Sequence, residues 1–181
     1  LTMSDQVKIT AREIINFWFP DGPNPETQAH LNFWSWRMQG GANDEIKAKY
    51  TEVTRRAAEG EFDNWANDPI GRLALIILLD QFPRTVWSGT SDAYAQDPKA
   101  LGLCLEGLKN GHFDALENVW FKTVFKLPME HCECSNHLAN LDRVIAIADQ
   151  ILEDAPDNLK HRAFNLIHSL LGKSSSSILV G

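Results

Sequence analysis

The segment 70–82 is apolar around nearly its whole circumference. Just before it, Asp68 and Pro69 form the usual opening of a helix, a capping carboxylate followed by proline at the first helical position. A helix that is apolar on all sides is stable only when other elements surround it. We therefore expect this helix to lie at the centre of a helical bundle and to end at Pro83.

Helix start and stop signals recur along the rest of the chain, whereas the alternating pattern of strands does not. Helices are predicted over residues 10–19, 26–38, 43–60, 91–110 with a kink or restart at 97–98, 114–125, 134–153, and as a last helix ending at 171–172. Short connections favour antiparallel neighbours. The sequence thus predicts one all-α domain over 8–172, with about eight helices in antiparallel pairs, and a flexible tail over 173–181.

One predicted helix, 134–153, carries a regular apolar stripe that we expect to face the core. The stripe comprises Leu138, Leu141, Ile145, Ala148 and Leu152.

Composition narrows the class of protein. The chain has 17 Lys and Arg against 24 Asp and Glu, a net charge of −7, which opposes binding to nucleic acid. The longest purely apolar run, 73–79, is too short to span a membrane, and no signal peptide pattern opens the chain. Three cysteines, two of them only two residues apart, do not suggest disulfides. We expect a soluble, cytoplasmic protein.

The sharpest polar feature is the run Asp80-Gln81-Phe82-Pro83-Arg84 at the end of the central helix. Asp80 continues the apolar face of Leu73 and Ile77, and a carboxylate there must be paired or hydrogen-bonded. Two interpretations stay open. Asp80 and Arg84 form a structural pair that locks the helix end, or they are ligand-binding or acid–base groups at a cleft.

A second polar cluster follows Pro128. His131, Cys134 and His137 could share one helix face, but their spacing matches no standard zinc pattern, and we predict neither a metal nor a cofactor. His131 and Glu133 could instead be a His–carboxylate pair that titrates near neutrality. The plainer alternative is a helix start at which the acidic residues favour the positive end of the dipole.

Tryptophans are abundant, and Trp34 and Trp36 lie two residues apart. Residues at that spacing cannot share a helical face, so we expect one in the core and one at the rim. The alternative is an aromatic-lined groove for a peptide or small ligand.

Four segments carry a resemblance to a known family: F-W-F at 17–19, the block ending in L-L-D-Q-F-P-R at 71–84, Ala93-Tyr94 with Asp97, and L-P-M-E-H-C-E at 127–133. Over roughly residues 10–172 the chain resembles the domain of unknown function 924 family, a bacterial all-helical group with tetratricopeptide-like helix pairing. The resemblance implies a tetratricopeptide-repeat-like superhelix or bundle. It implies a fold and not a reaction.

The chain departs from the family pattern at several positions. Thr85 stands where the family usually has Asn, Ser88 where it has Arg, and Cys132 where it has Ser. A basic segment near the C-terminus is reduced to residues 167–169 and 171–173. If that segment contributes to a site, this chain lacks the activity or takes a different ligand.

Three functions are open. The first is a helical binding or scaffold module that holds a peptide or small polar ligand. The second is a small-molecule enzyme, such as a hydrolase, with His131 as general base, oriented by Glu133 or Asp80, and Arg84 holding an anionic group. The third is a purely structural or assembly protein. The candidate ligand-binding residues are Asp80, Gln81, Arg84, His131 and Glu133, and we expect His131 to lie beside Asp80 and Arg84.

Overall fold

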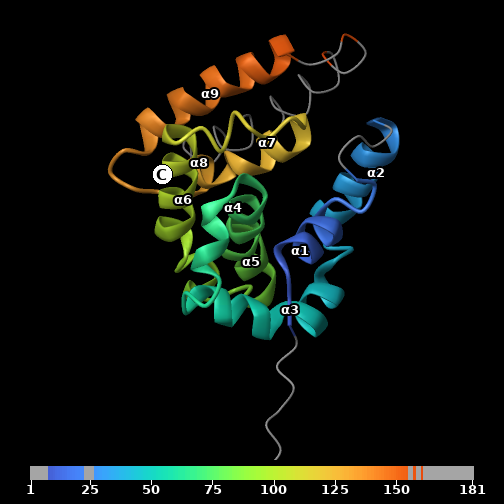
Figure 1. Cartoon of the computed structure of the whole chain (residues 1–181). Helices are drawn as coiled ribbons and strands as arrows, with labels where there is room; N and C mark the ends of the chain where they lie inside the picture. The colour runs from blue at the N-terminus through green and yellow to red at the C-terminus, as the bar shows by residue number, and fades with distance from the viewer. Residues whose placement is uncertain (1–7, 23–26, 155–156, 158–159, 161–181) are drawn as a thin grey trace, which may run out of the picture.

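The computed structural model describes residues 8–22, 27–154, 157 and 160 (Figure 1). Within this part every regular element is a helix, as predicted. The α-helices are α1 (Ala11–Trp18), α2 (Thr27–Met38), α3 (Asn43–Ala58), α4 (Pro69–Ile76), α5 (Phe82–Val86), α6 (Asp97–Lys109), α7 (Val119–Phe125), α8 (Leu127–His131) and α9 (His137–Asp154). Shorter elements are the 3₁₀ turns η1 (Asp63–Asn67) and η3 (Ser91–Tyr94), and the π-helical turn η2 (Ile77–Gln81).

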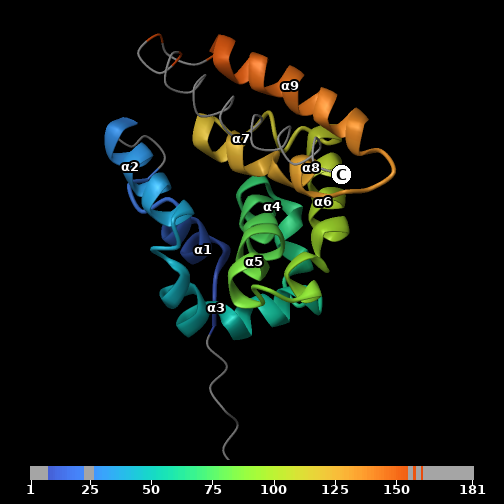
Figure 2. The same cartoon turned by 180° about the vertical axis from the view of Figure 1, so that it is seen from behind.

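The central helix is α4, as its composition predicts. Every residue from 71 to 80 is buried, and α4 packs against α1, α6 and α7. Both views show α4 and α5 in the middle, with α1 to α3 on one side and α6 on the other (Figures 1 and 2). The helix begins as expected, since the Asp68 carboxylate accepts a hydrogen bond from the Gly71 N–H at 2.9 Å.

The prediction that this helix ends at Pro83 is wrong. Residues 77–81 widen into the π turn η2, and helix resumes as α5 with Pro83 in its first turn. Proline has no N–H and its ring crowds the carbonyl four residues earlier, which a regular α-helix could not accommodate. The wider turn before Pro83 relieves that conflict, so the chain continues in the same direction.

Two further boundaries differ from the prediction. The helix expected to start at Asp114 starts at Val119, because the Asn118 side chain accepts hydrogen bonds from the N–H groups of Trp120 and Phe121 and thereby caps α7. A proline shortly after the predicted helix 114–125 is expected to close it, but Pro128 lies in the first turn of the next helix, α8. At the 97–98 position the chain does restart, as α6.

The apolar stripe predicted for α9 is rotated. Leu138 and Ile145 are 74% and 48% exposed, whereas Val144, Ala148 and Ile151 are buried. The helix lies across the end of the bundle, beside α7 and α8 (Figures 1 and 2), and the face toward these helices is the one centred on Val144. The sequence has enough apolar residues on both faces of this helix, so the pattern alone does not determine which face is buried.

The predicted last helix, the tail and the altered basic segment near residue 170 lie outside the described residues. The boundaries of the domain and the tetratricopeptide-like pairing remain predictions. No helix in the described part is long and apolar enough to cross a membrane.

Replacing Ile77 with Ala is expected to lower the free energy of unfolding by about 2–5 kcal/mol, because Ile77 is fully buried at the centre of the bundle. Chemical denaturation measures the change. The matched control is Ile145→Ala on the exposed face of α9, with an expected loss below about 1 kcal/mol. A loss below about 0.5 kcal/mol for Ile77→Ala would mean that the segment is peripheral.

Candidate functional site

Asp80 lies in the π turn η2 and is fully buried. Its carboxylate is nevertheless well supplied with donors. His131 Nδ1 lies 2.9 Å from each carboxylate oxygen, and the Gln81 side-chain amide donates to Oδ2. A guanidinium nitrogen of Arg84 lies 3.7 Å from Oδ1. The negative charge is therefore balanced inside the protein without water.

His131 is the last residue of α8 and remains partly open, with its side chain 29% exposed. An ionised carboxylate can only accept hydrogen bonds, so the hydrogen of the neutral imidazole lies on Nδ1, facing Asp80. Nε2 then carries the free lone pair. A buried carboxylate that fixes the tautomer and orientation of a partly exposed histidine is the arrangement found in general-base catalysis.

Arg84 is held more firmly than the sequence suggests. Its two terminal nitrogens each lie 2.9 Å from an oxygen of Asp97 at the start of α6, and Nη1 also donates to the backbone oxygen of Asp80 at 2.6 Å. Burial opposes the charge on Arg84, but the hydrogen bonds to Asp97 and the charge of Asp80 outweigh that effect and raise its pKa. The terminal nitrogens of Arg84 are therefore already engaged by Asp80 and Asp97, and its role in holding an anionic ligand group remains a prediction.

His131 and Arg84 border a cavity of about 620 Å³. Its lining comes from α5, η3, α6, α8 and the residues just after α8: Arg84, Tyr94, Asp97, Pro98, Glu130, His131, Cys132 and Glu133. Of the five candidate residues, His131, Arg84 and Glu133 line the cavity. Asp80 lies behind His131 and does not line it, and Gln81 lines a different cavity.

Sequence reasoning missed Asp97 and the pair of Lys126 with Glu130. Lys126 is almost fully buried and forms an ion pair with Glu130 one helical turn later, so Glu130 borders the cavity with its charge already balanced. The four-residue spacing was a signal for this pair. Asp97 stood within the family-like residues, but nothing in its local sequence linked it to Arg84, thirteen residues earlier.

The cluster His131, Cys134 and His137 does not converge. His137 Nδ1 contacts the Cys132 backbone oxygen at 3.0 Å, and the Asn140 amide donates to Cys134 Sγ at 3.6 Å. Over the residues that the structure describes, no group of three or more His, Cys, Asp or Glu side chains is placed to hold a metal ion.

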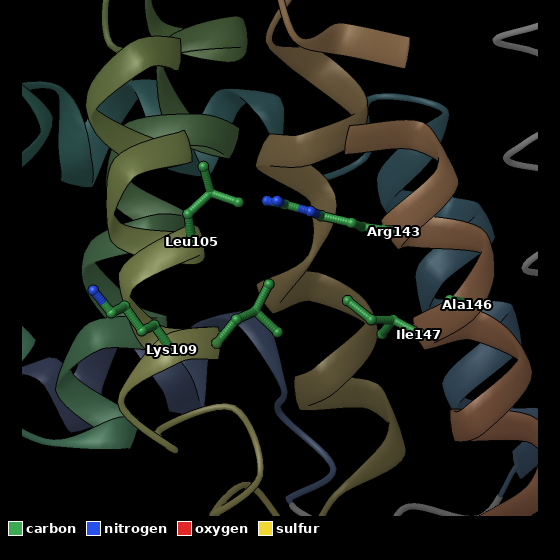
Figure 3. A pocket seen from close by; sticks show the side chains of 6 residues that line it. Leu105, Lys109, Arg143, Ala146 and Ile147 are labelled. Atoms are coloured by element: carbon green, nitrogen blue, oxygen red, sulfur yellow. The ribbon is translucent and has the colours of Figure 1, made fainter. Parts of the chain in front are cut away.

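Trp34 is buried and Trp36 is exposed, as their spacing predicts. No tryptophan lines the described wall of the His131 cavity, so an aromatic groove does not form there. A separate cavity of about 480 Å³ lies between α6 and α9, with Leu105 and Lys109 on one side and Arg143 and Ile147 on the other (Figure 3). The described wall of that cavity holds no acid or histidine and offers no acid–base pair.

Comparison with known proteins identifies relatives of similar fold whose function is unknown. A solved structure, titled as that of the protein of unknown function ATU0120 from Agrobacterium tumefaciens, is 26% identical in sequence, with a TM-score of 0.59. The match covers 86% of this chain and 78% of that one. No curated protein matches. The family model described as "Bacterial protein of unknown function (DUF924)" matches residues 14–173, and the chain therefore belongs to the DUF924 family.

Proposed function

We propose that the cavity beside His131 is a small-molecule acid–base site. The observation that carries the proposal is the contact of His131 Nδ1 with both oxygens of the buried Asp80, at 2.9 Å each. With Nδ1 engaged, Nε2 can take a proton from a bound ligand or from a water molecule that attacks it, and can later return that proton. Asp80 stabilises the imidazolium formed in between, since its charge has no water to screen it.

The charges around the cavity favour a ligand that donates hydrogen bonds. Asp97 and Glu130 are paired with Arg84 and Lys126, whereas Glu133 is exposed and forms no ion pair with any described residue. Glu133 and His131 Nε2 therefore both act as acceptors toward the cavity. A hydroxyl, amine or ammonium group fits this pair better than an anion does.

Binding without turnover is the second candidate, and the engagement of Arg84 favours it. Catalysis of hydrolysis usually needs a donor that stabilises developing negative charge, and Asp97 already occupies the terminal nitrogens of Arg84. Burial, with Cys134 nearby, raises the pKa of Cys132, so this thiol at the cavity wall is a poor nucleophile. A pocket with these properties could hold a small polar ligand or the end of a peptide unchanged.

The proposed location is the cytosol. All three cysteines, Cys104, Cys132 and Cys134, are free thiols. Burial raises the pKa of the Cys104 thiol to about 12. Free thiols in these numbers are typical of a reducing compartment.

Hydrolysis of p-nitrophenyl acetate by the full chain tests the acid–base proposal. We expect saturable release of nitrophenolate that falls about tenfold or more in His131→Gln, because the neutral imidazole is the reactive group. The matched control, His137→Gln, removes a partly exposed imidazole that lies outside the cavity lining and should leave the rate unchanged. Equal rates in wild type and His131→Gln would contradict the proposal, while saturable binding of the ester without release would favour the second candidate.

Replacing Asp80 with Asn separates a site from a structural ion pair. Arg84 keeps Asp97 in the variant, so we expect the unfolding free energy to fall by about 1–3 kcal/mol, the range for losing hydrogen bonds to a charged group. Hydrolysis of the ester should fall much further, because Asn no longer fixes the imidazole tautomer.

Denaturant unfolding and the ester assay measure the two effects of Asp80→Asn. The control is Asp142→Asn, an exposed acid on α9. A stability loss of about 3–5 kcal/mol with an unchanged rate would identify Asp80 as purely structural.

A further inference from the structure

Arg37, in the last turn of α2, is enclosed by aromatic rings. The residue is only 7% exposed. Its guanidinium carbon lies 3.7 Å from the ring centre of Trp18, 4.6 Å from that of Trp34 and 5.2 Å from that of Phe33. The rings hold the guanidinium plane in place through cation–π contacts.

Only one of the three nitrogens of this guanidinium has a partner in the described part of the chain. Nη1 donates to the Trp18 backbone oxygen at 2.6 Å, whereas Nε and Nη2 are buried without a hydrogen-bond partner there. Nε and Nη2 share one edge of the guanidinium. That edge is the planar fork that binds two oxygens of a carboxylate or phosphate group.

The charge on Arg37 is unbalanced by any described acid. Burial lowers the pKa of Arg37 to about 9, and no carboxylate offsets that effect. Glu45, an acid near Arg37 in the first turn of α3, pairs with Lys49 at 2.7 Å. The side chain stays charged at neutral pH, and a buried charge without a counter-ion is strongly unfavourable. An anion would remove this penalty.

Arg37 borders a cavity of about 390 Å³ whose described wall holds two arginines and no acid. Arg84 is the second arginine, with its charge already balanced by Asp97, and Asn43, Gln81 and Thr85 supply neutral polar groups. Asn43 begins α3, a helix of 16 residues whose N-terminus has no side-chain cap. The positive end of that helix dipole lies at Asn43, and the first turn of α3 also carries Asp44 and Glu45, so the positive charge in this cavity rests on Arg37.

We propose that this cavity is an oxyanion-binding site, in which the Nε–H and Nη2–H groups of Arg37 donate to two oxygens of a carboxylate or phosphate group. The site is separate from the His131 cavity and shares only Arg84 with its lining. Nε and Nη2 are shielded from water, so the anion reaches them when rim side chains such as Met38, which is 60% exposed, move aside.

Thermal unfolding of the full chain with inorganic phosphate and, separately, with acetate tests the site. Sodium chloride keeps the ionic strength constant. We expect at least one anion to raise the Tm of wild type saturably, by roughly 5–10 °C at a hundredfold excess over its Kd. In ¹H–¹⁵N spectra the Nε–H signal of Arg37 should shift over the same concentrations. The anion that acts identifies the ligand as a phosphate or a carboxylate.

Two variants make the experiment decisive. Arg37→Met should fold, since it removes an unpaired charge, and should show no rise with either anion. Arg143→Met, the same change at an exposed arginine of α9, should respond like wild type. If Arg37→Met does not fold, Arg37→Lys replaces it, and the loss of the fork should weaken binding about tenfold or more.

Equal responses in wild type and the Arg37 variant overturn the proposal. A wild type that responds to neither anion overturns it as well. Neither outcome bears on His131, since the ester assay reports on the other cavity.

Discussion

A carboxylate without access to water, that of Asp80, is the constraint on which the arrangement of this protein depends. It lies in a stretch, residues 71–80, in which every residue is buried, and an unpaired charge there would be strongly unfavourable. Its hydrogen-bond partners come from η2 and α8, and Arg84 on α5 forms an ion pair with it and extends the network to Asp97 on α6. Segments up to 51 residues apart in sequence are thus held together at one point, and the cavity beside His131 lies where they meet.

Much of this could be predicted because it depends on local rules. Thr10 and Glu13 form a capping box, a local sequence signal, at the start of α1, and Asp68 caps the central helix. The need of Asp80 for donors follows from its place on an apolar face, and the proximity of Asp80, Arg84 and His131 follows from packing helix ends together.

The features that could not be predicted are those for which several residues of the sequence are equally suitable, such as the partner of an arginine or the buried face of a helix. Arg84 has acidic residues before and after it in sequence, and only the packing of α6 selects Asp97. The helix α9 has enough apolar residues to bury either of two faces. The face with Val144 packs toward α7 and α8, and the face with Ile145 is exposed. Arg37 is a basic residue in the last turn of α2, a position at which a cation is usually exposed. Phe33 and Trp34 lie one helical turn before it, but its burial also needs Trp18 of α1, which the local sequence does not connect to it.

Because of the π turn before Pro83, the direction in which the Asp80 side chain points depends on the number of residues in this turn as well as on their type. A π turn is equivalent to one extra residue inside an α-helix. Removing one residue from 77–79 would take out the extra residue and rotate Asp80 by about 100° relative to the residues before the deletion. The Asp80 carboxylate would then turn away from His131, and Pro83 would follow a regular α-helical turn that its ring crowds. A single-codon deletion in this turn would therefore separate Asp80 from His131 without removing either residue.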